Sequence, residues 1–362
     1  MSAEPSLDPF LPAGHPVHTR TLGVEVFQED ADHVRAQGAV LDLRKCGFVP
    51  TGGDLQAAGF IHHMLLDGHV HQASRVLERL EVSQPVVAFE ANATTGGESC
   101  RDPAGNLQKM LGTRLDQDFV RRLGQVFGGP LGCSHLLTLG QLMGSTLPRV
   151  LDHEEALARA GRGPREAVER LWRRALIVDG FEASEDEMVV AVQLTDVATA
   201  PHCEVERSPL DRFEAQHEVR VLARVDLANM SFRSLGAAER TRRREDLADL
   251  AFRDRSAELT ELVGGSALGG LAKRLLERVG NDPQDRPFLD ALLNLAPGLV
   301  QCLAALSHRL MAQVAAGKME RGSAVRTAGV GGFADSCYMW RRGSALARIR
   351  SQHPEKTRES GS

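Results

Sequence analysis

A cysteine and a histidine stand two residues apart in the segment GGPLGCSH, which ends at His135. Its glycines and proline predict a tight turn, and the apolar run that follows predicts a helix. A thiol at a helix start meets unpaired backbone amides and the helix dipole, so we expect Cys133 to titrate below a free cysteine. The pair could serve as metal ligands or as a thiol nucleophile with its imidazole base. A buried cysteine beside a core histidine would give the same pattern.

Cys100 adds a third donor, because it stands just before the turn-forming sequence RDPAGN. Three donors at separate turns predict either a metal site or a Cys/His catalytic pair. The expected metal ligands are therefore Cys100, Cys133 and His135, around zinc or iron. Their spacing is not that of a zinc finger or zinc ribbon.

His62 lies in the apolar segment FIHHMLL, which predicts a strand. Alternation along that strand turns His62, Met64 and Leu66 toward the helices and turns His63 away from them. His62 is thus either a further catalytic or metal-binding residue or a hydrogen-bonded histidine of the core. The remaining histidines of the first strands are expected on solvated faces: His15, His18, His69 and His71.

The chain carries two copies of one pattern in tandem. Pairs of matching residues recur at a nearly constant spacing: Arg20 with Arg174, Asp42 with Asp196, His62 with His217, Cys100 with Phe252, Cys133 with Leu289, and His135 with Ala291. The second copy loses both cysteines and the helical histidine but keeps the residues around them, so the fold does not need these three. His217 survives, which favours a partly structural role for His62. Asp196 also survives, and we expect Asp42 to form a surface ion pair with Lys45.

Each copy presents strands first and helices afterwards, which predicts an α+β fold with a small antiparallel sheet and helices packed on one face. Apolar residues every four positions predict one amphipathic helix through Leu115–Phe127 and its equivalent through Ala267–Val279. The predicted units are a flexible arm over 1–17, the first copy over 18–151, a helical connector over 152–173, a degenerate second copy over 174–315, a linker and return segment over 316–350, and a disordered tail over 351–362.

Composition excludes several classes of protein. The 362 residues carry a formal net charge of −5 at pH 7, with 42% hydrophobic and 25% charged residues, so the basic excess of a nucleic-acid-binding protein is missing. The most apolar stretch, 292–306, is interrupted by polar residues and too short to span a bilayer. Six cysteines without regular spacing suggest a reducing compartment, and we expect a cytoplasmic protein. The Arg, Ala, Gly and Leu content is typical of a bacterial gene.

At these residues the chain resembles the bacterial family called domain of unknown function 2889. The likeness covers residues 18 to 147 and 333 to 343, through the pieces HTRTL, VLDLRK, IHHMLL, Cys100, GGPLGCSHL and DSCYMWRRG. Where the family's tail pattern has a histidine after its cysteine, this chain has Tyr338. The resemblance implies Cys337 as a further metal ligand that returns to the first copy across the whole second copy.

A more distant likeness concerns the fold. The order of strands, Cys100, helix and Cys133-led helix is similar to the U-type iron–sulfur scaffold proteins, in which cysteines and a histidine at such turns hold a cluster. In this chain His62 stands where the first scaffold cysteine would be.

These observations predict a zinc- or iron-centred enzyme of lyase or hydrolase type that acts on a small oxygenated substrate. The alternatives are a metal-free thiol catalyst with His135 as base and Asp42 or Lys45 orienting the substrate, a scaffold for an iron–sulfur cluster or sulfur, and a binding protein without chemistry. The second copy is expected to pack against the first as an intramolecular pseudo-dimer, so that the protein could be monomeric overall.

Overall fold

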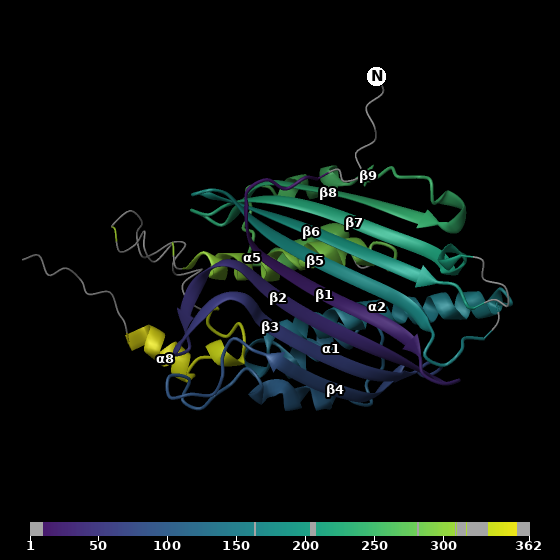
Figure 1. Ribbon diagram of the computed structural model, residues 1–362, viewed down its shortest axis with the longest axis horizontal. Coiled ribbons are helices and arrows are strands. Elements are labelled where there is room, and N and C mark those ends of the chain that lie inside the picture. The colour runs from purple at the N-terminus through teal and green to yellow at the C-terminus, as the bar shows by residue number, and fades with distance from the viewer. Residues whose placement is uncertain are drawn as a thin grey trace, which may run out of the picture.

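The computed structural model describes residues 10–162, 164–202, 208–280, 282–307, 309, 316 and 332–352. Within these residues, nine strands form one antiparallel sheet in the order β4-β3-β2-β1-β5-β6-β7-β8-β9 (Figure 1). The strands of the first copy are β1 (His15–Gln28), β2 (His33–Thr51), β3 (Asp54–His71) and β4 (Val76–Val86). Those of the second are β5 (Arg170–Ser184), β6 (Glu187–Thr199), β7 (Phe213–Asp226), β8 (Ser231–Arg243) and the short β9 (Arg253–Asp254).

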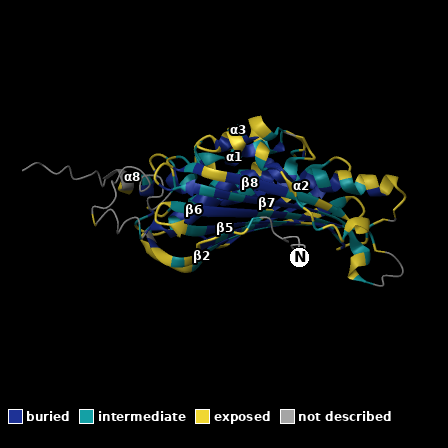
Figure 2. Ribbon diagram, turned by 90° about the horizontal axis from the view of Figure 1, so that it is seen from above, coloured by how far each residue is buried: buried dark blue, intermediate teal, exposed yellow. Residues whose placement is uncertain are grey.

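The helices of the described residues cover one face of this sheet, and none of them lies on the other face (Figure 2). They are α1 (Phe119–Phe127), α2 (Ser134–Arg159), α3 (Leu271–Val279), α4 (Arg286–Leu293), α5 (Leu295–Ala305) and α8 (Ala345–Gln352). Short 3-10 turns complete the layer: η1 (Asp102–Met110), η2 (Gly129–Leu131), η3 (Pro209–Arg212), η4 (Arg244–Asp246), η5 (Ser256–Leu262) and η6 (Tyr338–Trp340). The predicted α+β class and the helices on one face are confirmed.

The alternation of buried and more exposed residues follows from this one-sided covering. In β1, Val24 and Val26 are fully buried while Glu25 between them is half-buried. The same rule operates in β3, where His62, Met64 and Leu66 are buried and His63 is half-buried, as the sequence predicted. The core therefore lies between the sheet and the helical layer.

The two copies meet edge to edge rather than as separate sheets. Strand β1 pairs antiparallel with β5, so the four strands of the first copy and the five of the second become one continuous sheet. The helical layers cross this junction: α5, from the second copy, contacts β1 and β2, while α2, from the first copy, contacts β5. Each half is thus partly covered by a helix of the other.

Several predicted boundaries shift. The arm is shorter than predicted, because β1 begins at His15; residues 1–9 lie outside the described residues. Only the first part of the stretch predicted as a helical connector is helical: it continues α2 to Arg159, and β5 begins at Arg170, inside the predicted connector. The strand predicted at FIHHMLL is longer than that segment: it runs from Asp54 to His71, and the β3–β4 turn lies at 72–75. Residues 317–331 of the linker and 353–362 of the tail lie outside the described residues.

One helical run among the described residues, Arg286–Ala305 across α4 and α5, is long and apolar enough to cross a membrane, with a mean hydropathy of 1.5. In this structure 67% of its most apolar window is buried inside the protein, as is usual for a core helix.

Candidate functional site

The site centres on Asp42, whose side chain is fully buried in the middle of β2. Strand register places it beside Arg20 of β1 and His62 of β3, so three polar side chains stand in one cross-strand row. A β-bulge at Ile61 interrupts the pairing of β2 with β3 here, and both Ile61 and His62 are buried as a result. The start of α2 brings His135 above this row.

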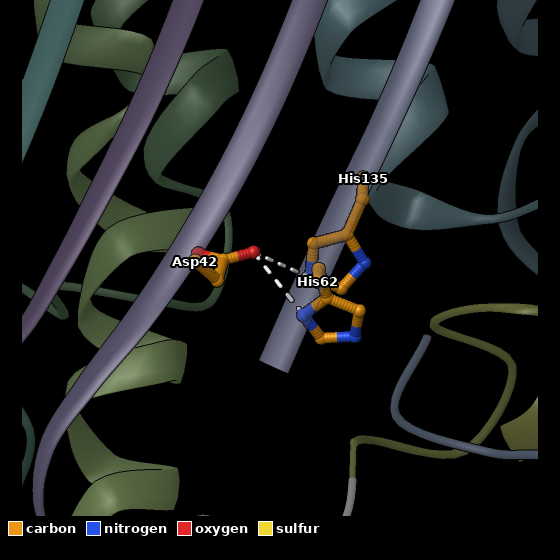
Figure 3. A group of neighbouring side chains, drawn as sticks. All are labelled: Asp42, His62 and His135. Carbon is orange, nitrogen blue, oxygen red and sulfur yellow. Dashed lines mark ion pairs between the residues drawn. The ribbon is translucent and has the colours of Figure 1, made fainter. Parts of the chain in front are cut away.

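The two carboxylate oxygens of Asp42 have different surroundings. Oδ1 lies 3.1 Å from Nε2 of His18 in a hydrogen bond. Oδ2 lies 3.2 Å from Nδ1 of His62, 3.3 Å from Nε2 of His135 and 3.6 Å from Nη1 of Arg20, yet no contact of Oδ2 has hydrogen-bond geometry (Figure 3). Nδ1 of His62 also has no hydrogen-bond partner. Two buried polar atoms thus face each other without bonding.

His135 receives a hydrogen bond from the other half of the molecule. Nε2 of Gln301, on α5, lies 3.2 Å from Nε2 of His135. Because an amide nitrogen can only donate, the ring nitrogen is the acceptor and carries a lone pair instead of a proton. Asp42 Oδ2 then faces a lone pair instead of an N–H group.

The second copy offers an internal comparison, since its strands have the same register. Arg174, Asp196 and His217 occupy the row equivalent to Arg20, Asp42 and His62. There the arginine closes on the carboxylate: Nε and Nη2 of Arg174 lie 2.7 and 2.6 Å from the two oxygens of Asp196. The equivalent row in the first copy is open, with only the 3.6 Å contact of Arg20.

The open row has the dimensions of a metal site. Asp42, His62 and His135 each offer one ligand atom, and these atoms lie within 4.8 Å of one another. Zinc bonds of 2.0–2.2 Å to nitrogen and oxygen separate tetrahedral ligands by roughly 3.3–3.6 Å. The separations of 3.2 and 3.3 Å from Oδ2 are close to that range. Two of the three ligand atoms, Oδ2 of Asp42 and Nδ1 of His62, have no hydrogen-bond partner, and Nε2 of His135 would exchange the hydrogen bond of Gln301 for the ion. This buried group could hold a metal ion.

The protonation of the site suits a cation. Burial would raise the pKa of Asp42, but the charge of Arg20, the hydrogen bond of His18 and the close His62 ring outweigh it and hold the pKa well below its usual value. Burial lowers the pKa of His62 and, with the neighbouring His62 charge, that of His135. The two rings stack with centroids 3.7 Å apart. A carboxylate and two neutral imidazoles are the forms that ligate metals.

Cys133 is the first residue of the turn that opens α2, and its Sγ lies 3.8 Å from Nδ1 of His135 and 3.7 Å from Sδ of Met64. The predicted lowering of its pKa is wrong. Burial raises the pKa to about 12, although the amides of Leu136 and His135 act to lower it. The helix start does stabilise a thiolate, but the loss of water around the buried sulfur outweighs it.

All three predicted cysteines line one cavity of about 760 Å³, together with His62 and His135. Cys337 returns from beyond the second copy, held by a hydrogen bond from the amide of Tyr338 to the carbonyl oxygen of Gly132. Burial raises the pKa of Cys100 and of Cys337. The group of ligand atoms around Asp42 contains none of the three cysteines.

Two expectations for the polar residues are wrong. Asp42 is not in a surface ion pair with Lys45, whose Nζ instead lies 3.6 Å from Asp179 of β5. His18 is not solvated but is 1% exposed against Asp42. One signal was available: Asp42 shares the strand face of the buried Val40, whereas Lys45, three positions on, does not. Nothing in the sequence pointed to Gln301.

Residues 18–148, which are the first copy, match the model of a family described as protein of unknown function (DUF2889). The resemblance noted in the sequence is confirmed over these residues. Among curated proteins and solved structures, none matches the chain. The likeness to iron–sulfur scaffold proteins therefore stays a prediction.

Proposed function

We propose that the protein is a metal-centred enzyme, with zinc or iron held by Asp42, His62 and His135, that acts on a small oxygenated substrate as a lyase or hydrolase. The observation that carries the proposal is the open row of the first copy: buried ligand atoms lie 3.2 and 3.3 Å apart and are not hydrogen-bonded to one another. In the second copy, Arg174 hydrogen-bonds both oxygens of the equivalent Asp196, and Ala291 stands where the first copy has His135.

A divalent ion with an open position supplies Lewis acidity toward a substrate oxygen. The chain's own residues have separate tasks. His18 donates to Oδ1 of Asp42 and so holds the carboxylate in place. Cys133 lies next to the Nδ1 of His135, where a sulfur can accept the N–H that fixes the ring. The cavity gives the substrate access to His62 and His135, while Asp42 stays fully buried behind them.

Metal content tests the proposal. Protein purified without oxygen should contain about one equivalent of zinc or iron by elemental analysis. Asp42→Asn and His135→Ala should lose the metal, whereas the matched second-copy variant His217→Ala should keep it. Melting curves establish that each variant is folded. Metal-free wild-type protein that also fails to take up Zn²⁺ or Fe²⁺ would overturn the proposal, as would full retention in Asp42→Asn.

Cobalt substitution distinguishes the new ligand set from the cysteine set predicted from the sequence. A Co²⁺ site of one carboxylate and two imidazoles has no sulfur-to-metal charge-transfer band, whereas ligation by Cys100 or Cys133 produces one. We expect no such band, and we expect Cys133→Ser to bind cobalt as the wild type does. A charge-transfer band that disappears in Cys133→Ser would show that sulfur is a ligand.

A thiol catalyst is the second candidate, favoured by one further arrangement. The His135 ring lies between the Cys133 sulfur and the Asp42 carboxylate. Sγ of Cys133 is 3.8 Å from Nδ1 of the ring, and Oδ2 of Asp42 is 3.3 Å from Nε2. This is the order of nucleophile, base and orienting acid in a catalytic triad. The buried thiol, with its pKa of about 12, makes this candidate weaker than the metal centre.

A further inference from the structure

Arg44 is a buried cation without a carboxylate partner. It lies on β2 two residues beyond Asp42, on the same face, and is only 4% exposed. Its Nη1 donates to the carbonyl oxygen of Gln56 at 2.8 Å, its Nε has no hydrogen-bond partner, and no acid lies within 4.0 Å in the described part of the chain. A guanidinium that is buried without an opposite charge is unfavourable, so a carboxylate from outside the chain would stabilise it.

Arg20 repeats the pattern at the other side of the site. It is 2% exposed, and its Nε and Nη2 have no hydrogen-bond partner. In the second copy the equivalent Arg174 uses Nε and Nη2 on Asp196, and its Nη1 lies 2.7 Å from Asp290. The fold can therefore place carboxylates against the N–H groups of an arginine at this position. In the first copy, most N–H groups of Arg20 have no such acceptor.

Both arginines line the same cavity of about 760 Å³ as His62 and His135. Among the described residues that line it there is no aspartate and no glutamate. The described lining thus presents two guanidinium groups and no carboxylate; Asp42, behind the lining, lies 3.6 Å from Arg20, and Arg44 has no such partner. A binding site of this kind matches an anion.

The rest of the wall is mostly apolar, and part of it is aromatic. The rings of Phe89 and Trp340 pack edge to face with centroids 5.7 Å apart, and both residues line the cavity. Met230 from the β7–β8 turn and Val300 from α5 extend the apolar wall from the second half of the chain. A cavity of this size accommodates a small organic molecule.

We propose that this cavity binds a small organic acid, with its carboxylate on Arg44, with Arg20 adding positive charge to the same cavity, and with its apolar, aryl-bearing body along the wall of Phe89 and Trp340. A guanidinium binds a carboxylate through two parallel N–H groups, which supplies orientation as well as affinity. The chemistry expected of this ligand rests on the proposed function, whereas its binding rests on the arginines alone.

The spacing of the strand also locates the reacting group of the ligand. Arg44 and Asp42 are two residues apart on one face of β2, which corresponds to about 7 Å. A carboxylate held by Arg44 therefore directs atoms several bonds away toward His62 and His135. The reacting oxygen of the substrate is expected in the chain or ring of the acid, not in its carboxylate.

Calorimetric titration with 3-phenylpropanoate and with its neutral amide tests this inference. Wild-type protein should bind the acid at least about tenfold more tightly than the amide. Arg44→Gln should weaken binding of the acid by about tenfold to a hundredfold and leave the amide unchanged. The control is Arg35→Gln on the opposite face of β2, where the exposed arginine binds the half-buried Asp67, and this variant should bind the acid as the wild type does.

The same titrations on chelator-treated protein and on His135→Ala separate this inference from the proposed metal centre. Tight, Arg44-dependent binding without metal supports the carboxylate site even if the metal proposal fails. Equal affinity for acid and amide would overturn the inference, as would no binding of the acid at millimolar concentration. Binding that needs bound metal but is unaffected by Arg44→Gln would also overturn it, because the metal would then be the carboxylate's partner.

Discussion

Replacing the equivalent arginines of the two copies should have very different effects on stability. Arg174 is fully buried and makes short charge-assisted contacts with Asp196 and Asp290, at 2.6 to 2.7 Å. Arg174→Met would leave buried Asp196 with only the hydrogen bond of Trp172 and a 4.0 Å contact with Arg149, whereas Asp290 would keep Arg286 and Ser145. Removing one partner of a buried ion pair costs about 3–5 kcal/mol, so we expect a loss in that range.

The same change at Arg20 should cost much less. Its contact with Asp42 at 3.6 Å is worth about 4–5 kcal/mol at an effective dielectric constant of 20. The variant also removes a buried guanidinium with two unpartnered nitrogens, whose desolvation costs several kcal/mol and offsets most of that attraction. Asp42 still keeps the hydrogen bond of His18. We therefore expect Arg20→Met to destabilise the protein by at least about 2 kcal/mol less than Arg174→Met.

Urea unfolding followed by circular dichroism, in the presence of a chelator, measures this difference. The midpoints report stability if the slopes of the variants agree with that of the wild type. Arg35→Gln serves as a surface control and should lie within about 0.5 kcal/mol of the wild type. Equal losses at the two positions, or a larger loss for Arg20→Met, would refute the reasoning that the first copy holds an open, energetically costly site.

Two further outcomes follow from burial. Because burial raises the pKa of Cys133 to about 12, its thiol stays protonated at pH 8. Iodoacetamide should therefore label Cys133 in folded protein only as the pH approaches 12, as read by mass spectrometry. Rapid labelling at pH 8 would instead favour the thiol catalyst. In the core, a Cβ at Gly180 would lie 2.1 Å from Sγ of Cys302, so Gly180→Ala should lower the free energy of unfolding by about 1–3 kcal/mol. The double variant with Cys302→Ala should recover most of that loss in urea unfolding, and no recovery would mean that the clash lies elsewhere.

Local pattern was enough to predict the elements of this fold. Alternation in β3 predicted that His62 faces inward and His63 outward, and both predictions are confirmed. Spacing by four predicted the helix that is α1, and a glycine turn predicted the start of α2 just after Cys133. These features depend on periodicity and turn chemistry, which neighbouring residues carry in full.

Local reasoning failed where burial opposes a local effect. The helix start favours a thiolate at Cys133, and only the packing of the cavity wall shows that loss of water is the larger effect. The residues around Asp42 suggested an ion pair with Lys45, but the carboxylate belongs to the buried face of β2. Burial depends on residues far away in the chain, so no short window contains it.

The sequence by itself determined the duplication, the α+β class and the inward direction of His62, because repeats, periodicity and turns are properties of the chain's own order. Only the tertiary structure decided which residues meet. Strand register puts Arg20, Asp42 and His62 in one row, the start of α2 adds His135, and α5 brings Gln301 from the other half. Contacts across strands and between halves depend on register and packing, which are set by the burial of the whole sheet under both helical layers.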